Sequence, residues 1–199
     1  MLLDEGKLIA NEVMGWLRPG CERLEMAGSI RRGKAEVKDV ELVCIPAMCM
    51  QQYGLFDTVQ MSMTVQISMV DGCLAEAMSA GVLRFDEVVK RNGPKYKRLV
   101  HVMSGAVVEL FAAEPGNWGL VLAIRTGPGE FNRLLVTKQR FGGAMPLGMQ
   151  MAGGQLLRGG CVVETPTEER FFELLEVPCW PPEERTETRL REYLGARWR

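Results

Sequence analysis

The stretch AGSIRRGKAEVKDVELVCIP, residues 27–46, brings a glycine-serine turn, two adjacent arginines and a pair of alternating acids together. Its second half, VKDVELVCIP, is rich in β-branched and apolar residues and ends at a proline, which predicts a strand. Successive side chains of a strand point to opposite faces, so Asp39 and Glu41 share one face while Val40 points inward. Two carboxylates at that spacing repel each other, and a divalent cation between them is the usual remedy.

A third acid lies in a later apolar run. The stretch KYKRLVHVMSGAVVELFAA, residues 95–113, predicts a β-hairpin that turns at Ser104-Gly105 and places Glu109 in its second strand. Burial of an unpaired charge costs several kcal/mol, so an acid in such a strand needs a partner. If this strand pairs with the strand of Asp39 and Glu41, three carboxylates surround one point, as two-metal phosphoryl transfer requires. Oxygen ligands favour two Mg²⁺ or Mn²⁺ ions over zinc.

The Gly28-Ser29 turn provides an anion site beside these acids. Backbone N–H groups in a turn of small residues bind anions, and Ser29 and an arginine one turn later can contact phosphate oxygens. Taken alone, GSIRRG fits a surface turn with solvated arginines equally well. The acid pair that begins ten positions after Ser29, followed by the isolated Glu109, favours a triphosphate site instead.

Composition restricts the classes of function. The chain has 199 residues, six cysteines without a CxxC pair and a single histidine, His101. This excludes a zinc ribbon and disfavours triad hydrolases, whose general base is usually histidine. The apolar runs are too short and interrupted to cross a bilayer, and the N-terminus has acids where a secretory signal needs basic residues. We therefore expect a cytoplasmic, or at least intracellular, protein with no membrane contact.

The net charge of −1 hides opposite local balances. Residues 90–158 contain ten Lys and Arg against three Glu, and ten minus three gives +7. This excess predicts a surface that faces phosphates. The candidate DNA-binding residues within it are Lys95, Lys97, Arg98, Arg133, Lys138 and Arg140. The acidic runs of the last forty residues are typical of solvated helix starts.

The order of predicted elements indicates an α+β fold. Residues 3–17 have apolar positions near helical spacing, and Pro19-Gly20 ends that helix. Within the Met-, Gln-, Ser- and Thr-rich region 48–70, the alternation over residues 59–70 predicts a strand, and residues 71–81 predict a short helix after it. After residue 115 the chain predicts short helices, a glycine-rich hairpin, and a helix with a threonine at its N-cap. We expect a first domain over residues 1–114 and a second over residues 115–199.

These motifs resemble those of the nucleotidyltransferase superfamily, and in particular of family X DNA polymerases related to DNA polymerase beta. GSIRRG is similar to the family's GS turn, KDVELV to its two-acid strand and VVELF to its third-acid strand. AIRTGPGEFN, residues 123–132, resembles the family's aromatic-aromatic-Thr-Gly-Ser segment, and FFELLEVPCWPPEERTE its C-terminal end. The resemblance covers most of the chain, with residues 47–92 the least similar part, and implies a palm domain with a mixed sheet and a small α/β thumb.

The resemblance also implies a role for each matched residue. Asp39, Glu41 and Glu109 would bind two Mg²⁺ or Mn²⁺ ions, and Glu109 would help to deprotonate the primer 3′-hydroxyl. The residues that would bind the incoming nucleotide are Gly28, Ser29, Arg32, Thr126, Gly127 and Asn132. The expected activity is DNA-directed DNA synthesis of the gap-filling or repair type, by a monomer that acts on primer-template or gapped duplex with nucleoside triphosphates. The chain begins one helix before the GS turn, so it resembles the minimal viral members that lack the lyase domain.

Two departures from the family pattern alter these expectations. The family has three aspartates, whereas this chain has Asp39, Glu41 and Glu109, and each Glu adds a methylene and a torsion. Ile124 and Arg125 replace two aromatics, one of which acts as a steric gate, so we expect ribonucleotide incorporation. Two alternatives stay open: a non-polymerising nucleotidyltransferase that modifies a protein, an RNA end or a small molecule, and a catalytically silent relative that binds nucleic acid.

Overall fold

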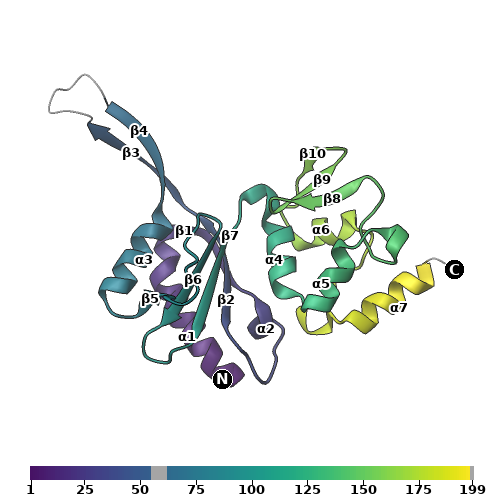
Figure 1. The fold of residues 1–199 in the computed structure, drawn as a ribbon, viewed down its shortest axis with the longest axis horizontal. Coiled ribbons are helices and arrows are strands. Elements are labelled where there is room, and N and C mark those ends of the chain that lie inside the picture. Colours follow the sequence, from purple (N-terminus) through teal and green to yellow (C-terminus); the bar gives the residue numbers. More distant parts are fainter. Residues whose placement is uncertain (55–61, 198–199) are drawn as a thin grey trace.

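The computed structural model describes residues 1–54 and 62–197 and has two lobes side by side (Figure 1). The first lobe, here called the palm, is built on a five-stranded sheet with the order β1-β2-β7-β6-β5. Its strands are β1 (Cys21–Met26), β2 (Val40–Pro46), β5 (Leu83–Phe85), β6 (Tyr96–His101) and β7 (Val107–Ala112). The β2–β7 pair is parallel and the other pairs are antiparallel, so the sheet is mixed. The predicted α+β fold is confirmed.

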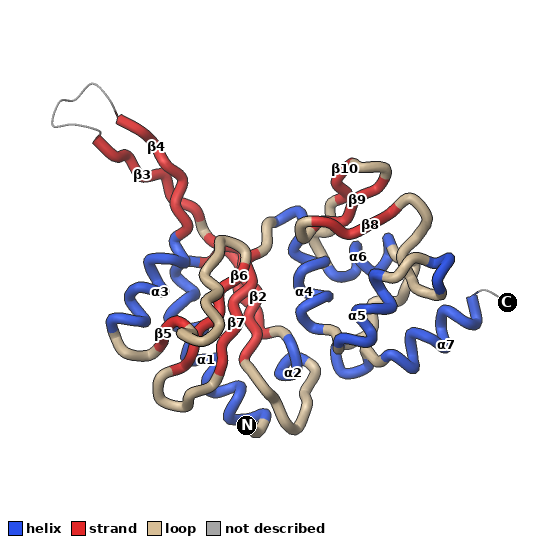
Figure 2. Tube along the Cα trace, in the orientation of Figure 1, coloured by secondary structure: helices blue, strands red, loops and turns tan. Residues whose placement is uncertain are grey.

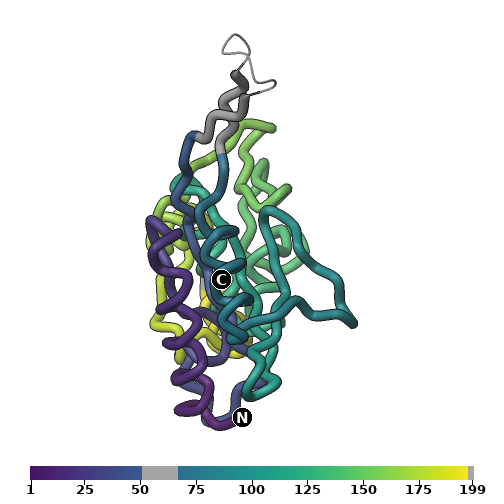
Figure 3. Tube along the Cα trace, turned by 90° about the vertical axis from the view of Figure 1, so that its left-hand side faces the viewer, coloured from purple at the N-terminus to yellow at the C-terminus, as the bar shows by residue number. Residues whose placement is uncertain are grey.

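The palm sheet is covered differently on its two faces. Its alternate positions Val40, Leu42 and Cys44 point to one face, where helices α1 (Leu3–Leu17) and α3 (Met69–Ser79) complete a buried core. Figure 3 looks at that side and shows α1 in front of the sheet. The intervening positions Val43 and Ile45 face the other lobe, where they pack with Phe111 and Trp118. Asp39, Glu41 and Glu109 belong to this second set of positions.

A two-stranded hairpin of β3 (Met48–Gly54) and β4 (Ser62–Ser68) projects from the palm (Figure 2). The predicted strand in this region is β4, and the predicted helix after it is α3, which begins at Met69. The sequence pattern did not predict β3 as a separate strand. Part of the predicted strand, residues 59–61, lies outside the described residues.

The second lobe, here called the thumb, has its own core of buried aromatic and aliphatic side chains. Its helices are α4 (Trp118–Thr126), α5 (Gly129–Val136), α6 (Glu168–Leu174) and α7 (Glu187–Arg197). Thr167 caps α6, and its hydroxyl accepts the N–H of Arg170, as the predicted N-cap requires. The glycine-rich segment forms the predicted hairpin, β8 (Met149–Ala152) with β9 (Gln155–Arg158), and β10 (Cys161–Val163) extends it to three strands.

Short 3-10 turns connect several of these elements, at Arg18–Gly20, Pro115–Asn117, Gln139–Phe141 and Pro182–Glu184. Within the part of the chain that the structure describes, no helix is long and apolar enough to cross a membrane. The same part contains no cis peptide bond.

Candidate active site

The three acids come from neighbouring parallel strands. In the β2–β7 register Glu41 lies directly opposite Glu109, and Asp39 immediately precedes β2. Parallel strands in register place equivalent side chains on the same face, about 4.8 Å apart along the hydrogen-bonding direction. The sheet topology therefore puts Glu41 and Glu109 on adjacent strands, on the face of the sheet where Val43 and Phe111 pack against α4 of the thumb.

Burial and like charge raise the proton affinity of Asp39 and Glu41. Burial raises the pKa of Glu41 to about 7, and the charges of Asp39 and Glu109 add to that rise. Burial, followed by the charge of Glu109, also raises the pKa of Asp39 above its usual range. The charges of both other acids thus act on Glu41, and the charge of Glu109 acts on Asp39. Such an electrostatic arrangement is typical of a site that binds cations.

Glu109 has partners on the opposite side of its strand. Its Oε1 accepts hydrogen bonds from Tyr96 Oη at 2.7 Å and Arg98 Nη1 at 2.6 Å, and both donors belong to β6. Because β7 lies between β2 and β6, these contacts draw the Glu109 carboxylate away from Asp39 and Glu41.

The donor set suits a hard divalent ion, although its side chains are not gathered around one point. Carboxylate oxygens are the ligands that Mg²⁺ and Mn²⁺ prefer. Within residues 1–54 and 62–197, however, no three Asp, Glu, Cys or His side chains are arranged as a metal site. The chemistry of the residues therefore fits the ions, while Glu109 as placed does not complete the ligand set.

The Gly28-Ser29 turn lies against the carboxylate of Glu41. Gly28 has φ +59°, and a Cβ atom there would lie 1.8 Å from Glu41 Oε2. Only glycine combines the left-handed backbone with the space for that carboxylate. The short helix α2 (Gly28–Arg31) follows, and this arrangement brings the predicted anion site beside the predicted metal ligands.

Two buried polar atoms of this turn have no hydrogen-bond partner among the described residues: Ser29 Oγ and Arg32 Nε. Buried polar groups usually have a hydrogen-bond partner, so these two atoms are available to bind an added group such as an anion. Burial also lowers the pKa of Arg32, whereas the charges of Glu41 and Asp39 act to raise it. A phosphate group would supply both hydrogen bonds and negative charge, so these residues fit the predicted triphosphate contact.

The thumb residues predicted to bind the nucleotide lie at the end of α4. Thr126 is fully buried; its hydroxyl accepts Arg31 Nη1 at 2.8 Å and its carbonyl accepts Arg32 Nη1. Gly127 is the C-cap of α4. The amide of Asn132 donates to the carbonyls of Ile124 and Gly127 at 2.6 and 2.9 Å, which leaves its buried Oδ1 without a partner among the described residues. These three residues thus form one corner, and their nucleotide contacts stay a prediction.

The predicted DNA-binding residues divide between the lobes, and several have protein partners. Lys97 pairs with Asp71 at 2.8 Å, and Arg98 pairs with both Asp86 and Glu109. The remaining contacts are Lys95 Nζ to the Gly153 carbonyl, Arg133 to Glu130, and the Arg140 guanidinium over the Phe141 ring. Lys138 lies between α5 and the 3-10 turn at Gln139–Phe141.

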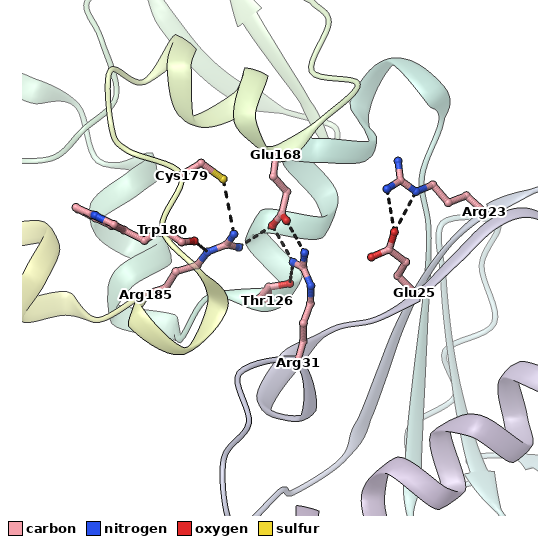
Figure 4. Close-up of polar contacts among 8 residues, drawn as sticks. All are labelled: Arg23, Glu25, Arg31, Thr126, Glu168, Cys179, Trp180 and Arg185. Carbon is pink, nitrogen blue, oxygen red and sulfur yellow. Dashed lines mark hydrogen bonds and ion pairs between the residues drawn. The ribbon is translucent and has the colours of Figure 1, made fainter.

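An ionic network between the lobes is a feature that the sequence did not reveal. Figure 4 shows Arg31 extending from α2 to Glu168, which lies at the start of α6. Glu168 also contacts Arg185. Arg31 Nη2 and Arg185 Nη1 lie 2.5 and 2.6 Å from the two Glu168 oxygens. Burial alone would raise the pKa of Glu168, but the hydrogen bonds from Arg31 and Arg185 lower it below its usual range. The helix after the GS turn is thereby fixed to the thumb.

Arg125 is a second unexpected feature of the site. Its guanidinium lies 3.7 Å from the centroid of the Phe111 ring, which also stacks on Tyr96 at 4.9 Å. Burial lowers the pKa of Arg125, while the charges of Glu41 and Glu109 oppose that change. The same stack borders a cleft of about 650 Å³ that reaches the β8–β9 turn at Gly153-Gly154. The side chain at position 125 is therefore a cation whose charge acts on Glu41 and Glu109.

Comparison with known proteins identifies the fold. No protein-family model and no curated protein matches the sequence. Among solved structures, a polymerase beta from Leishmania infantum, determined as a ternary P/T complex, matches with a TM-score of 0.68. The chain has the polymerase beta fold. Sequence identity to that neighbour is 16%, and the match covers 94% of this chain and 76% of the neighbour.

Proposed function

We propose that this chain is a nucleotidyltransferase that extends a primer 3′-hydroxyl on a DNA template, as a gap-filling or repair-type polymerase. The observation that supports this most is the parallel register that sets Glu41 beside Glu109, with the unsatisfied Ser29 and Arg32 atoms next to them. The fold that the chain shares with the polymerase beta neighbour, which was solved with a primer-template, also supports this proposal.

In this proposal separate residues bind the metal ions, the triphosphate and the sugar and base of the nucleotide. Asp39 and Glu41 would hold two Mg²⁺ or Mn²⁺ ions, and Glu109 would complete the ligand set and take up the proton of the primer hydroxyl. The ions would stabilise the charge on the transferring phosphoryl group and its pyrophosphate leaving group. Ser29 and Arg32 would bind the triphosphate, and the corner of Thr126, Gly127 and Asn132 would face the sugar and the nascent base pair.

The basic side chains of both lobes would track the DNA backbone. Lys138, Arg140 and the exposed Arg133 lie on the thumb, and Lys95 lies next to β6 of the palm. Lys97 and Arg98 are left out of this role because they pair with Asp71, Asp86 and Glu109. Phosphate contacts position a duplex without reading its sequence. Binding should therefore weaken steeply as salt concentration rises.

A primer-extension gel with a templated and an untemplated primer tests this function. We expect extension by the complementary nucleotide with Mg²⁺ or Mn²⁺. We also expect measurable use of ribonucleotides, because Ile124 and Arg125 stand where the family has two aromatics, one of them the steric gate. Transfer that ignores the template would favour a non-polymerising nucleotidyltransferase. Duplex binding without any transfer would favour the catalytically silent relative.

A further inference from the structure

The position of Glu109 between two strands has a further consequence. On the β2 side its neighbour is Glu41, a like charge, and on the β6 side its neighbour in register is Arg98. Both hydrogen bonds of the Glu109 carboxylate go to the β6 side, and both end on the same oxygen, Oε1. The carboxylate is therefore held by residues that are not among the predicted metal ligands.

The cation on the β6 side is itself firmly placed. Arg98 Nε donates to Asp86 Oδ2 at 2.8 Å, and Asp86 Oδ1 accepts the N–H groups of Val88 and Val89. The side chains of Arg98, Asp86 and Glu109 are 24%, 11% and 16% exposed, so water screens these pairs only in part. Charge-assisted hydrogen bonds in such a setting are about twice as strong as neutral ones.

An ion bound by Asp39 and Glu41 would need the same carboxylate that Arg98 and Tyr96 hold. We propose that Arg98, oriented by Asp86 and assisted by Tyr96, is a positioning residue that competes with the divalent ion for Glu109 and so sets how tightly the site binds metal. The inference rests on the proposed function for the identity of the metal ligands. It explains why the acids share one electrostatic cluster without meeting at one point.

Competition for Glu109 and anchoring of Glu109 predict opposite changes in metal affinity when Arg98 or Tyr96 is substituted. If Arg98 and Tyr96 hold Glu109 away from the ion, their loss tightens metal binding. If they instead steady Glu109 in a coordinating position, their loss weakens it, as the loss of an outer-shell partner usually does. Tyr96→Phe separates hydrogen bonding from charge, because it removes a neutral hydroxyl and leaves every charge in place.

Titration of the full chain with Mn²⁺ alone, followed by electron paramagnetic resonance, tests the inference without DNA or nucleotide. We expect Arg98→Gln to bind Mn²⁺ about tenfold more tightly than the wild type, and Tyr96→Phe to change in the same direction by a smaller factor. The matched control is Arg84→Gln, the same substitution at an exposed arginine on the neighbouring strand β5. It should bind Mn²⁺ like the wild type.

Equal or weaker Mn²⁺ binding by Arg98→Gln and Tyr96→Phe would overturn the inference, as would the absence of Mn²⁺ binding from all variants. If Arg98→Gln does not fold, the double variant Asp86→Asn/Arg98→Gln removes the stranded acid and makes the same prediction. A wild type that extends no primer, while the order of Mn²⁺ affinities holds, would refute the proposed polymerase function and leave this inference standing.

Discussion

Glu41 is the residue at which burial and like charge act most strongly together. Its pKa of about 7 lies above the ordinary value of 4.5, because the carboxylate is desolvated and faces Asp39 and Glu109. The folded protein then binds a proton that the unfolded chain has released between pH 4.5 and 7. By linkage, the stability of the metal-free protein must fall as the pH rises through that range.

This linkage gives a prediction for Glu41→Gln. In a chelating buffer we expect the free energy of unfolding of the wild type to fall by on the order of 2 kcal/mol between pH 5 and pH 8. This corresponds to a fall of about 5 °C in Tm. Glu41→Gln should lose less, because its amide does not ionise. Thermal melts across this pH range provide the measurement. Parallel curves for the two proteins would contradict the assignment of the shift to Glu41.

The length of the side chain at position 109, a Glu and not an Asp, decides which residues its carboxylate contacts. The sequence shows only that a methylene and a torsion are added. The structure shows that the longer side chain contacts Tyr96 and Arg98 on the adjacent strand. The predicted hairpin already makes the strand of Tyr96 and Arg98 the neighbour of the strand of Glu109. Sequence alone could not predict the side-chain conformations that bring both donors onto the Glu109 carboxylate.

At the scale of elements, the start of α2 depends on a glycine that lies against a charged side chain. Gly28 and Gly33 both have positive φ, +59° and +64°. A Cβ atom at Gly28 would meet the Glu41 carboxylate, whereas one at Gly33 would have no atom within 4 Å. The two positions therefore separate backbone strain from displacement of Glu41.

We expect Gly33→Ala and Gly28→Ala each to destabilise the fold by about 1 kcal/mol through strain. Gly28→Ala alone should also lose primer extension and Mn²⁺ affinity, because Glu41 must move. Urea unfolding gives the first quantity, and extension with Mn²⁺ titration gives the second. Equal activity of the two variants would show that the contact between Gly28 and Glu41 does not matter for the site.

Most elements followed from local patterns, and the exceptions have physical causes. The helix at residues 3–17, the hairpin that turns at Gly105 and the cap at Thr167 are confirmed because spacing and turn chemistry are local signals. The strands β3 and β10 were not predicted separately. Gly159-Gly160 is a two-residue hairpin turn between β9 and β10, but the three residues of β10 are too few to show a strand pattern. The β2–β7 register is a long-range pairing, so the alternation of acids could suggest it but not fix it.

At the scale of the whole molecule, the charge balance of a sequence segment is an incomplete guide to a surface. The count of +7 for residues 90–158 omits Asp71 and Asp86, which lie outside that segment and pair with Lys97 and Arg98. Part of the basic excess is thus used inside the palm. The network of Arg31, Glu168 and Arg185 likewise joins residues that no sequence window contains together.

That network predicts a large effect of Glu168→Gln on the joint between the lobes. Loss of the carboxylate leaves Arg185, which is 2% exposed, and Arg31 without their shared counter-ion. We expect the free energy of unfolding of Glu168→Gln to fall by about 3 kcal/mol, as is usual when one partner of a buried ion pair is removed. Glu173→Gln, which breaks an exposed pair with Arg170, is the matched control and should change stability by less than about 1 kcal/mol. Equal unfolding curves for the two variants would show that the network does not stabilise the joint.

The central claim is that the carboxylates of neighbouring strands form a catalytic centre for templated synthesis, and Glu109→Gln tests it most directly. Extension of a labelled primer-template should fall by about three orders of magnitude, because the variant loses the proton acceptor at the primer hydroxyl. Duplex binding, measured by fluorescence anisotropy on the same DNA, should stay nearly unchanged. Undiminished extension by Glu109→Gln would contradict the account.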